Sequence, residues 1–442
     1  MSRHRRAAAA LALLAGLAVF ATSTRVFPYG SVNHDGAVYL QQAAMLLDGK
    51  PFLRPPVEGA FRPWFFVRDG ARLYPKYAPV PAAIFALGQL AGDASLALAA
   101  VGAAVVGLAY ATVAEAFDRR TGLLAAALVA ASPLFLVDAS TFLPYAPTAA
   151  LELAFAFAYL RADRTGRRGW AALAGAAIGL AFFARPYTAV CFAAPFVVHA
   201  LWVSRDRDRD VLARVGTTAL VGMAGVLVAL GYNVAVTGSP LLFPYRAFAP
   251  LDGLGFGRRA TLGYSIVYTP ALAVRAAALE LRAFAARWFA AGLLGTVLAA
   301  VGLGAFLRDA RRRDVDARQA VLAGLLLAVI VGNLYFWGNR NLLGSLADPT
   351  DGLITSLGPY YHFDLLLPTA AFAAYGSLAL ADRWRTLQRD RLADRSRRVA
   401  IAGLVVGALL VSTVAVAVAA PPLRENRATS DQLAAAYRPC FL

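Results

Sequence analysis

Cysteine and charge are both scarce in this sequence of 442 residues. The two cysteines, Cys191 and Cys440, stand far apart and neither has a CxxC partner, which argues against a disulfide framework and against a zinc site. Only 16% of the residues are charged and 59% are hydrophobic, whereas a soluble domain has about 25% charged and about 45–50% apolar residues. This shortage of charge indicates a polytopic membrane protein.

Acidic residues are fewer than basic ones, 26 against 43, which gives a net charge of +17. The basic residues are scattered in short clusters between apolar segments, and no basic domain or patch interleaved with aromatic residues is present. A nucleic-acid surface requires such a patch, so the net charge does not indicate a nucleic-acid partner.

The familiar catalytic and cofactor motifs are also missing. No Walker, HExxH or GxSxG motif occurs, and the predicted outer segments contain no Asp-x-Asp or His cluster. The glycine-rich run at residues 253–257 follows no predicted strand, so it does not indicate a nucleotide cradle. We therefore expect neither a metal nor a cofactor.

Long apolar segments recur between arginine-rich breaks, and about 20 such residues cross a bilayer. We predict about eleven transmembrane helices, with a half-buried piece at 79–92. Because lipid cannot satisfy backbone polar groups, we expect an all-α bundle that forms a single domain over residues 1–442. The predicted spans are 7–27, 95–116, 121–137, 144–160, 169–184, 187–203, 211–232, 286–307, 318–337, 360–381 and 399–420.

The distribution of arginine predicts an orientation, because short cytoplasmic loops carry the excess of Lys and Arg. The short arginine-rich breaks lie at 118–120, 161–168, 205–214, 308–318 and 383–398. Placing them in the cytoplasm puts the N-terminus inside and the C-terminus outside a plasma membrane. The longer segments then lie outside, where we expect them to form a cap that holds the chemistry; they are 28–80, 233–285, 338–359 and 421–442.

The first outer segment, 28–80, carries two motifs. Its start has the spacing Asp-x-x-x-Tyr-x-x-x-Ala-x-x-x-x-x-Gly, and the side chains of Asp35, Tyr39 and Gln42 there fall on one face of a predicted short helix. Its end has the run YPKYAP at residues 74–79. An acid, a phenol and an amide therefore share one face, and a lysine between two tyrosines follows later in the same segment.

These motifs and the topology resemble the GT-C glycosyltransferases, which use polyprenyl-phosphate sugars and include protein O-mannosyltransferases and the aminoarabinose transferase of lipid A. Weaker matches to the family are Arg185-Pro186 at an outer helix end and the run GPYY at 358–361. The chain has Asp35-Gly36 where the family commonly has Asp-Glu. Some members carry a second acid near the fourth span, and here the nearest acid is Asp138.

The resemblance implies that Asp35 is the catalytic base and that Lys76 binds the donor phosphate. A polyprenyl-phosphate donor already has a good leaving group, so transfer needs a base for the acceptor proton and cations for the departing phosphate. Each residue also has a structural alternative. Asp35 can cap the predicted helix, and Lys76 can be an interfacial lysine that extends to the headgroups.

Further polar residues in or near the outer segments are candidates for substrate contact, although each can instead be an interfacial anchor. Additional donor-phosphate ligands are expected at predicted outer helix ends, namely Arg185, Arg340 and His362. Residues expected to line a substrate groove are Tyr39, Gln42, Tyr74, Tyr77, Arg258 and Arg259.

The resulting hypothesis is an integral-membrane glycosyltransferase of the bacterial or archaeal plasma membrane, acting on its outer face. It would move one sugar from a polyprenyl-phosphate donor to a lipid, protein or glycan acceptor. Two alternatives remain, a polytopic lipid-carrier flippase or transporter and a catalytically inactive GT-C-like scaffold.

Overall fold

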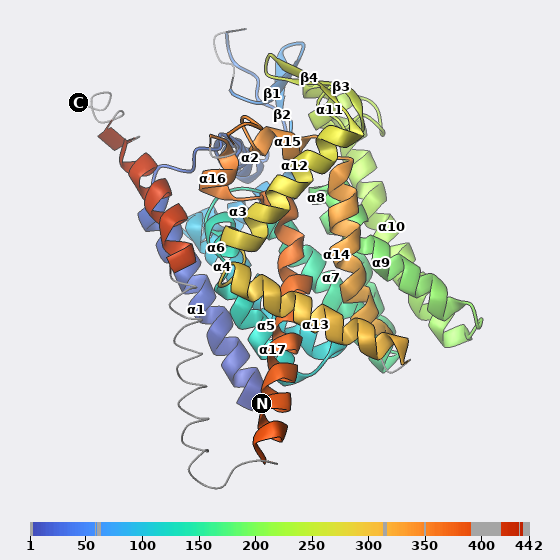
Figure 1. Cartoon of the computed structure of the whole chain (residues 1–442). Helices are drawn as coiled ribbons and strands as arrows, with labels where there is room; N and C mark the ends of the chain where they lie inside the picture. Colours follow the sequence, from blue (N-terminus) through green and yellow to red (C-terminus); the bar gives the residue numbers. More distant parts are fainter. Residues whose placement is uncertain are drawn as a thin grey trace.

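The computed structural model describes residues 3–57, 59, 63–312, 316–348, 351–389, 417–432 and 434–435. Long helices form the body of the molecule (Figure 1). In chain order they are α1 (Arg3–Val26), α4 (Ser95–Ala116), α5 (Arg119–Ala130), α6 (Pro133–Ala139), α7 (Tyr145–Thr165), α8 (Arg168–Ala184), α9 (Pro186–Ser204), α10 (Arg209–Thr237), α13 (Leu293–Arg311), α14 (Ala317–Leu334) and α17 (Leu366–Arg389).

Each predicted span up to 360–381 falls on helical residues, and the bounds of 95–116 agree with α4 to the residue. Seven helices in the described residues are long and apolar enough to cross a membrane, or eight if the bent pair α5 and α6 is one span. The predicted number of eleven is therefore not confirmed. Most of the predicted span 399–420 lies outside the described residues, of which 417–432 are helical.

The predicted span 121–137 is broken into two helices. Its halves α5 and α6 meet at an angle of 63°, and Pro133 is at the start of α6. Proline lacks the backbone N–H that would continue the preceding helix, so the bend follows from the sequence at this point.

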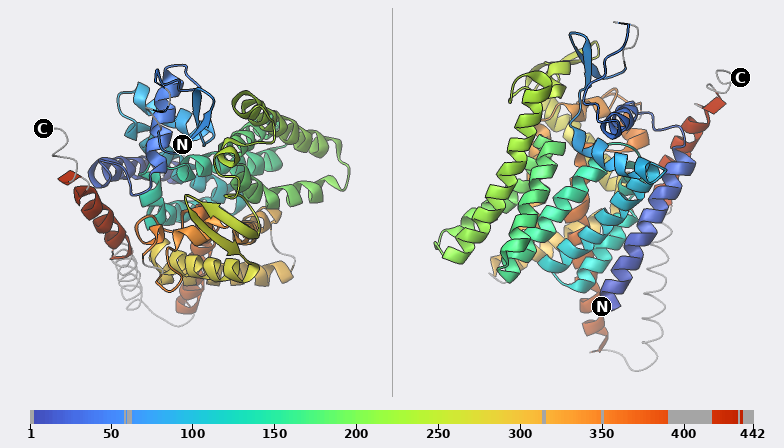
Figure 2. Two further views of the ribbon diagram at one scale, coloured as in Figure 1. Left: turned by 90° about the horizontal axis from the view of Figure 1, so that it is seen from above. Right: turned by 180° about the vertical axis from the view of Figure 1, so that it is seen from behind.

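Small residues allow close helix packing between α8 and α10. A Cβ atom added to Gly225 of α10 would lie 2.5 Å from the Cα of Gly179 on α8. Such contact between backbones is typical of membrane helices, whose association depends on close packing. The view from above in Figure 2 shows these helices (green) on the side of the bundle away from α1 (blue).

The predicted outer segments lie together at the end of the bundle opposite the N-terminus (Figure 1). The first contributes α2 (Asp35–Leu47), an antiparallel hairpin of β1 (Phe66–Asp69) and β2 (Arg72–Pro75), and α3 (Pro79–Leu90). The later ones contribute α11 (Pro244–Phe248), a second hairpin of β3 (Gly257–Thr261) and β4 (Tyr264–Tyr268), α12 (Pro270–Ala283), α15 (Gly338–Leu342) and α16 (Leu353–Leu357). A π-helix (Phe284–Trp288) and a 3-10 helix (Tyr360–Leu365) precede α13 and α17.

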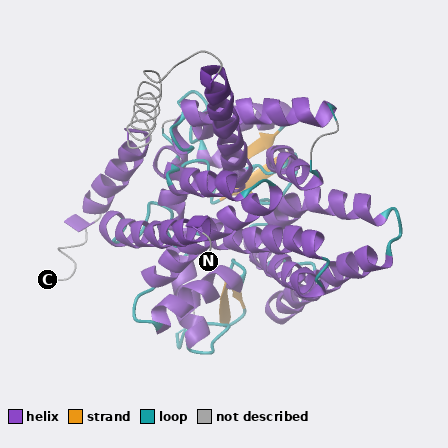
Figure 3. Ribbon diagram, turned by 90° about the horizontal axis from the view of Figure 1, so that it is seen from below, coloured by secondary structure: helices purple, strands orange, loops and turns teal. Residues whose placement is uncertain are grey.

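The fold is thus a helical membrane bundle with a cap, as predicted. Figure 3 shows mostly helices, and the strands of the described residues lie in the two small hairpins. The strands belong to the cap, where water can satisfy their free edges, and not to the apolar bundle.

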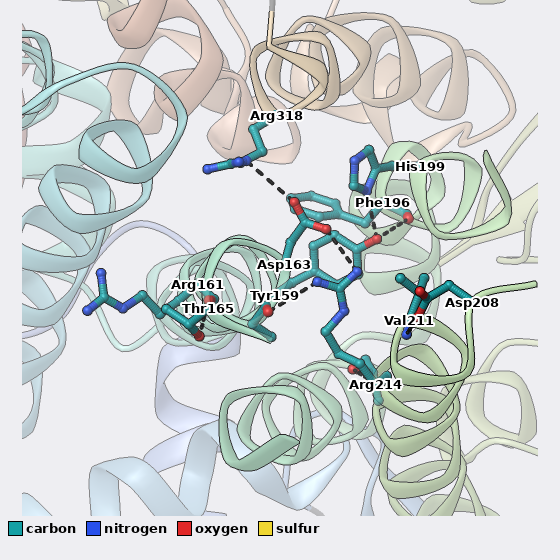
Figure 4. A network of polar contacts seen from close by, with 12 residues as sticks. Tyr159, Arg161, Asp163, Thr165, Phe196, His199, Asp208, Val211, Arg214 and Arg318 are labelled. Atoms are coloured by element: carbon teal, nitrogen blue, oxygen red, sulfur yellow. Dashed lines mark hydrogen bonds and ion pairs between the residues drawn. The ribbon is translucent and has the colours of Figure 1, made fainter. Parts of the chain in front are cut away.

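Ion pairs join the helices at the arginine-rich end. The Asp163 carboxylate of α7 lies 2.9 Å from Arg214 of α10 and 3.4 Å from Arg318 of α14 (Figure 4). On the same face of α7, the Tyr159 hydroxyl contacts Nδ1 of His199 at 2.9 Å. Arg214 and Arg318 are therefore each paired with a carboxylate within the protein.

Candidate active site

Asp35 is the first residue of α2, and its carboxylate is not used to cap that helix. The Asn33 side-chain oxygen accepts the Asp35 backbone N–H at 3.0 Å. The Tyr77 hydroxyl instead lies beside the Asp35 carboxylate and, as a donor toward it, acts to lower its pKa. The sequence allowed two roles for Asp35, catalytic base or helix cap. Because the Asp35 side chain does not cap α2, its carboxylate is available for chemistry.

Burial is the strongest influence on the Asp35 carboxyl and leaves its pKa above the ordinary value. The positive charge of Lys76 and the Tyr77 hydroxyl oppose this shift only in part. Burial, and next the charge of Asp35, hold the pKa of Tyr77 well above its ordinary value. Tyr77 therefore remains a hydrogen-bond donor to the carboxylate at neutral pH.

Tyr77 is held in place by the other two polar residues on the same face of α2. The ring of Tyr39 stacks on the ring of Tyr77 with centroids 4.6 Å apart. The Gln42 side-chain nitrogen donates to the Tyr77 carbonyl at 3.1 Å. Both side chains are 3% exposed, so they support the residue that holds Asp35.

Lys76 follows β2 and is buried in a cage of aromatic rings. Its Nζ lies 3.5 Å from the ring centroid of Phe65, 4.8 Å from Tyr77, 4.9 Å from Tyr245 and 5.1 Å from Phe248. Rings at such distances attract a cation through their negative faces. Burial lowers the pKa of Lys76, and the negative charges of Asp35 and Asp252 oppose this shift.

Phe65, the nearest wall of this cage, has a strained backbone with φ of 59°. Non-glycine residues in the left-handed region cost roughly 1–3 kcal/mol and persist where the surroundings impose them. Its carbonyl accepts the backbone N–H of Lys76 at 3.0 Å. The hairpin therefore fixes Phe65 and Lys76 relative to each other.

Arg185 supplies a second cation, at the junction of α8 and α9. Its guanidinium carbon lies 4.4 Å from the Tyr145 ring centroid and 5.8 Å from that of Tyr361. Within the described part of the chain, neither Arg185 nor Lys76 forms an ion pair with a carboxylate within 4.0 Å. Lys76, whose nearby negative charges are Asp35 and Asp252, and Arg185 are thus cations without an ion-paired carboxylate, and such cations suit a phosphate.

Residues from the second large outer segment complete the site, and no sequence motif predicted them. Tyr245 and Phe248 of α11 form two walls of the Lys76 cage. Asp252 accepts hydrogen bonds from the Tyr245 hydroxyl at 2.7 Å and from Trp337 Nε1 at 2.9 Å. These contacts join segments that are distant in the sequence, so no local motif could reveal them.

The remaining predicted site residues have other surroundings. His362 pairs with Glu280 at 2.8 Å, and both side chains are fully buried. Arg340 donates to the Gly344 carbonyl, and Arg259 donates to carbonyls of the glycine-rich turn. Arg258 is exposed on β3, and Tyr74 pairs with Val67 in the first hairpin. Asp138 is fully buried in α6, and its carboxylate oxygens have no hydrogen-bond partner among the described residues.

Comparison with known proteins supports the resemblance. Residues 77–232 match the family profile described as dolichyl-phosphate-mannose-protein mannosyltransferase. Solved structures with a similar fold include ArnT from Cupriavidus metallidurans bound to undecaprenyl phosphate, at 16% identity and TM-score 0.55, over 97% of this chain and 69% of that one. None of the curated protein sequences compared matches this chain.

A second similar structure is the archaeal oligosaccharyltransferase AglB from Archaeoglobus fulgidus, in complex with an inhibitory peptide and a dolichol-phosphate. The identity is 14% and the TM-score 0.51, over 95% of this chain and 55% of that one. The chain thus spans about half the length of that enzyme. Identities this low show a shared fold, and together with the family profile they confirm the resemblance to the GT-C glycosyltransferases.

Proposed function

We propose that this relative of the GT-C glycosyltransferases transfers one sugar from a polyprenyl-phosphate donor to an acceptor hydroxyl at the cap end of the bundle. One observation carries the proposal. The Asp35 carboxylate does not cap α2 and has the Tyr77 hydroxyl and the Lys76 ammonium near it, and among the described residues neither Lys76 nor Arg185 has a paired carboxylate. This arrangement provides the base and the cations that the reaction requires.

In the proposed reaction, Asp35 takes the proton of the acceptor hydroxyl as its oxygen bonds to the anomeric carbon. The bond from that carbon to the phosphate oxygen breaks, and the polyprenyl phosphate leaves with the electron pair. Lys76 and Arg185 stabilise the negative charge on the phosphate, and no acid is needed to protonate it. The aromatic cage holds the Lys76 ammonium at the position where that charge develops.

The donor class rests on the relatives. The two similar structures contain undecaprenyl phosphate and dolichol-phosphate, which share a long isoprenoid chain with a phosphate at its end. We propose the same class of donor here, with the acceptor on the outer face of a plasma membrane. The predicted orientation, with the arginine-rich loops inside, supports this placement.

One observation favours the flippase alternative. Glu152 of α7 and Asp364 before α17 are buried carboxylic side chains, and both carboxyl oxygens of Glu152 have no hydrogen-bond partner among the described residues. Buried carboxylates between membrane helices are frequent along ion and substrate pathways. A flippase moves its lipid across the bilayer without making a glycosidic bond, so product analysis separates the two functions.

The decisive experiment profiles lipid-linked sugars and surface glycans in a deletion strain, complemented with the wild type or with Asp35→Asn. We expect accumulation of a lipid-phosphate sugar and a glycan, lipid or protein that lacks one sugar, restored only by the wild type. Full restoration by Asp35→Asn, or accumulation of the donor on the inner face alone, would contradict the transferase proposal.

A further inference from the structure

A cavity of about 650 Å³ lies at the arginine-rich end of the bundle, opposite the candidate active site. It is lined by α1, α4, α7 and the start of α5 and α8 and is open on one side. Its lining includes four arginines, which are Arg5, Arg119, Arg161 and Arg164, and two acids, Glu115 and Asp118. Four positive and two negative charges leave a net charge of +2 in this cavity.

The two acids are already engaged by the protein. The Glu115 carboxylate pairs with Arg161 and with Arg164, each at 2.8 Å. Asp118 caps α5, accepting the backbone N–H groups of Arg120 at 2.7 Å and Thr121 at 3.1 Å. Glu115 therefore positions two guanidinium groups on one wall of the cavity.

The other two arginines lack such partners. Among the described residues, neither Arg5 of α1 nor Arg119 of α5 forms an ion pair with a carboxylate within 4.0 Å. Both side chains are exposed and both line the cavity. The site thus has two unpaired guanidinium groups and two that are fixed by Glu115, which is an arrangement that suits a phosphate.

The rest of the lining is apolar, which favours a lipid over a water-soluble anion. Ala8 and Ala12 of α1 face Gly107 and Ala111 of α4 along the cavity wall, and both helices are candidate membrane spans. Helix α1 lies at the edge of the bundle (Figure 2), and Leu13 and Leu17 on it are 67% and 66% exposed. The cavity therefore lies beside a surface that would face lipid.

We propose that this cavity binds the phosphate headgroup of an anionic phospholipid, with its acyl chains along α1 and α4. Basic pockets between membrane helices bind such headgroups. The site is separate from the Asp35 site and does not depend on the transferase proposal. The Asp163 network at the same end carries no such site, because Arg214 and Arg318 are paired there.

The test measures binding of phosphatidylglycerol and phosphatidylcholine to the purified full chain by native mass spectrometry. The variant Arg5→Ala/Arg119→Ala removes the two unpaired cations. The control Arg167→Ala/Arg311→Ala removes the same charge from exposed arginines that do not line the cavity. We expect the first variant to weaken phosphatidylglycerol binding by at least about tenfold, because contacts to charged groups are lost, and the control to bind like the wild type.

A second variant, Arg119→Glu, distinguishes loss of the binding site from misfolding of the first variant. Arg119 is the first residue of α5, where a negative charge interacts favourably with the helix dipole, so this variant should fold and still lose binding. Equal loss in the control, equal binding of phosphatidylcholine, or normal binding by folded Arg119→Glu would overturn the proposal. Competition by millimolar inorganic phosphate that displaces the lipid from the wild type would indicate a free-anion site and would also overturn it.

Discussion

The Asn33 side-chain oxygen accepts the backbone N–H of Asp35 at 3.0 Å, and the Tyr77 hydroxyl lies beside the Asp35 carboxylate and acts to lower its pKa. Asn33 thus satisfies one of the backbone donors at the start of α2 that have no partner within the helix. Separate residues for capping and for chemistry make the functional role of Asp35 testable without loss of the helix.

Lys76 and Lys50, the only two lysines, form a matched pair for testing the donor site. Lys76→Ala should weaken the apparent affinity for the lipid-phosphate donor by roughly 1.5–3 kcal/mol, the value of a charge-assisted contact. Lys76→Arg should retain part of the donor affinity. Lys50 is exposed and pairs with Asp48 at 3.0 Å, so Lys50→Ala should behave like the wild type. Unchanged donor affinity in Lys76→Ala would leave Lys76 with a purely interfacial role.

Tyr77 should control the pH dependence of transfer. The base must be ionised, so activity falls as the pH drops through the pKa of Asp35. The Tyr77 hydrogen bond lowers that pKa; Tyr77→Phe therefore raises it and should move the acidic limb of the rate profile to higher pH. Tyr74→Phe is the control, because Tyr74 does not act on Asp35. A limb that does not move in Tyr77→Phe would contradict the assignment of this limb to Asp35.

The buried pair of Glu280 and His362 should contribute to stability and not to donor binding. Removing one partner as Glu280→Ala leaves the imidazole without its partner in a fully buried position, and leaving a buried polar group unpaired costs about 1–3 kcal/mol. We expect a large loss in thermal stability with unchanged donor affinity for the protein that remains folded. Weakened donor binding at normal stability would instead support the sequence-based hypothesis that His362 binds the phosphate.

The sequence predicted the bundle better than the site. Apolar length alone placed α4 at Ser95–Ala116, since about 20 such residues are needed to cross a bilayer. The Lys76 cage could not be predicted, because its walls Tyr245 and Phe248 come from a distant segment. Glu152 is fully buried within α7, and a single acid in an apolar run does not show from the sequence which groups surround it in the fold.

The orientation makes a prediction of its own. The arginine-rich breaks place the N-terminus inside and the C-terminus outside. A reporter that is active only in the periplasm should therefore be active when fused after Leu442, and a cytoplasmic reporter at the same point should be silent. The opposite pattern would place the Asp35 end of the bundle inside the cell.

The central claim is that Asp35 is the base, and Asp35→Asn tests it most directly. Asparagine keeps the size of the side chain and ranks close to aspartate at helix starts, and Asn33 continues to accept the backbone N–H at position 35. General-base assistance contributes about 10²–10⁴-fold in rate. The measurement is the rate of sugar transfer by the purified variant, alongside its thermal stability. We predict wild-type stability with transfer reduced at least about a hundredfold; wild-type transfer by the well-folded variant would contradict the claim.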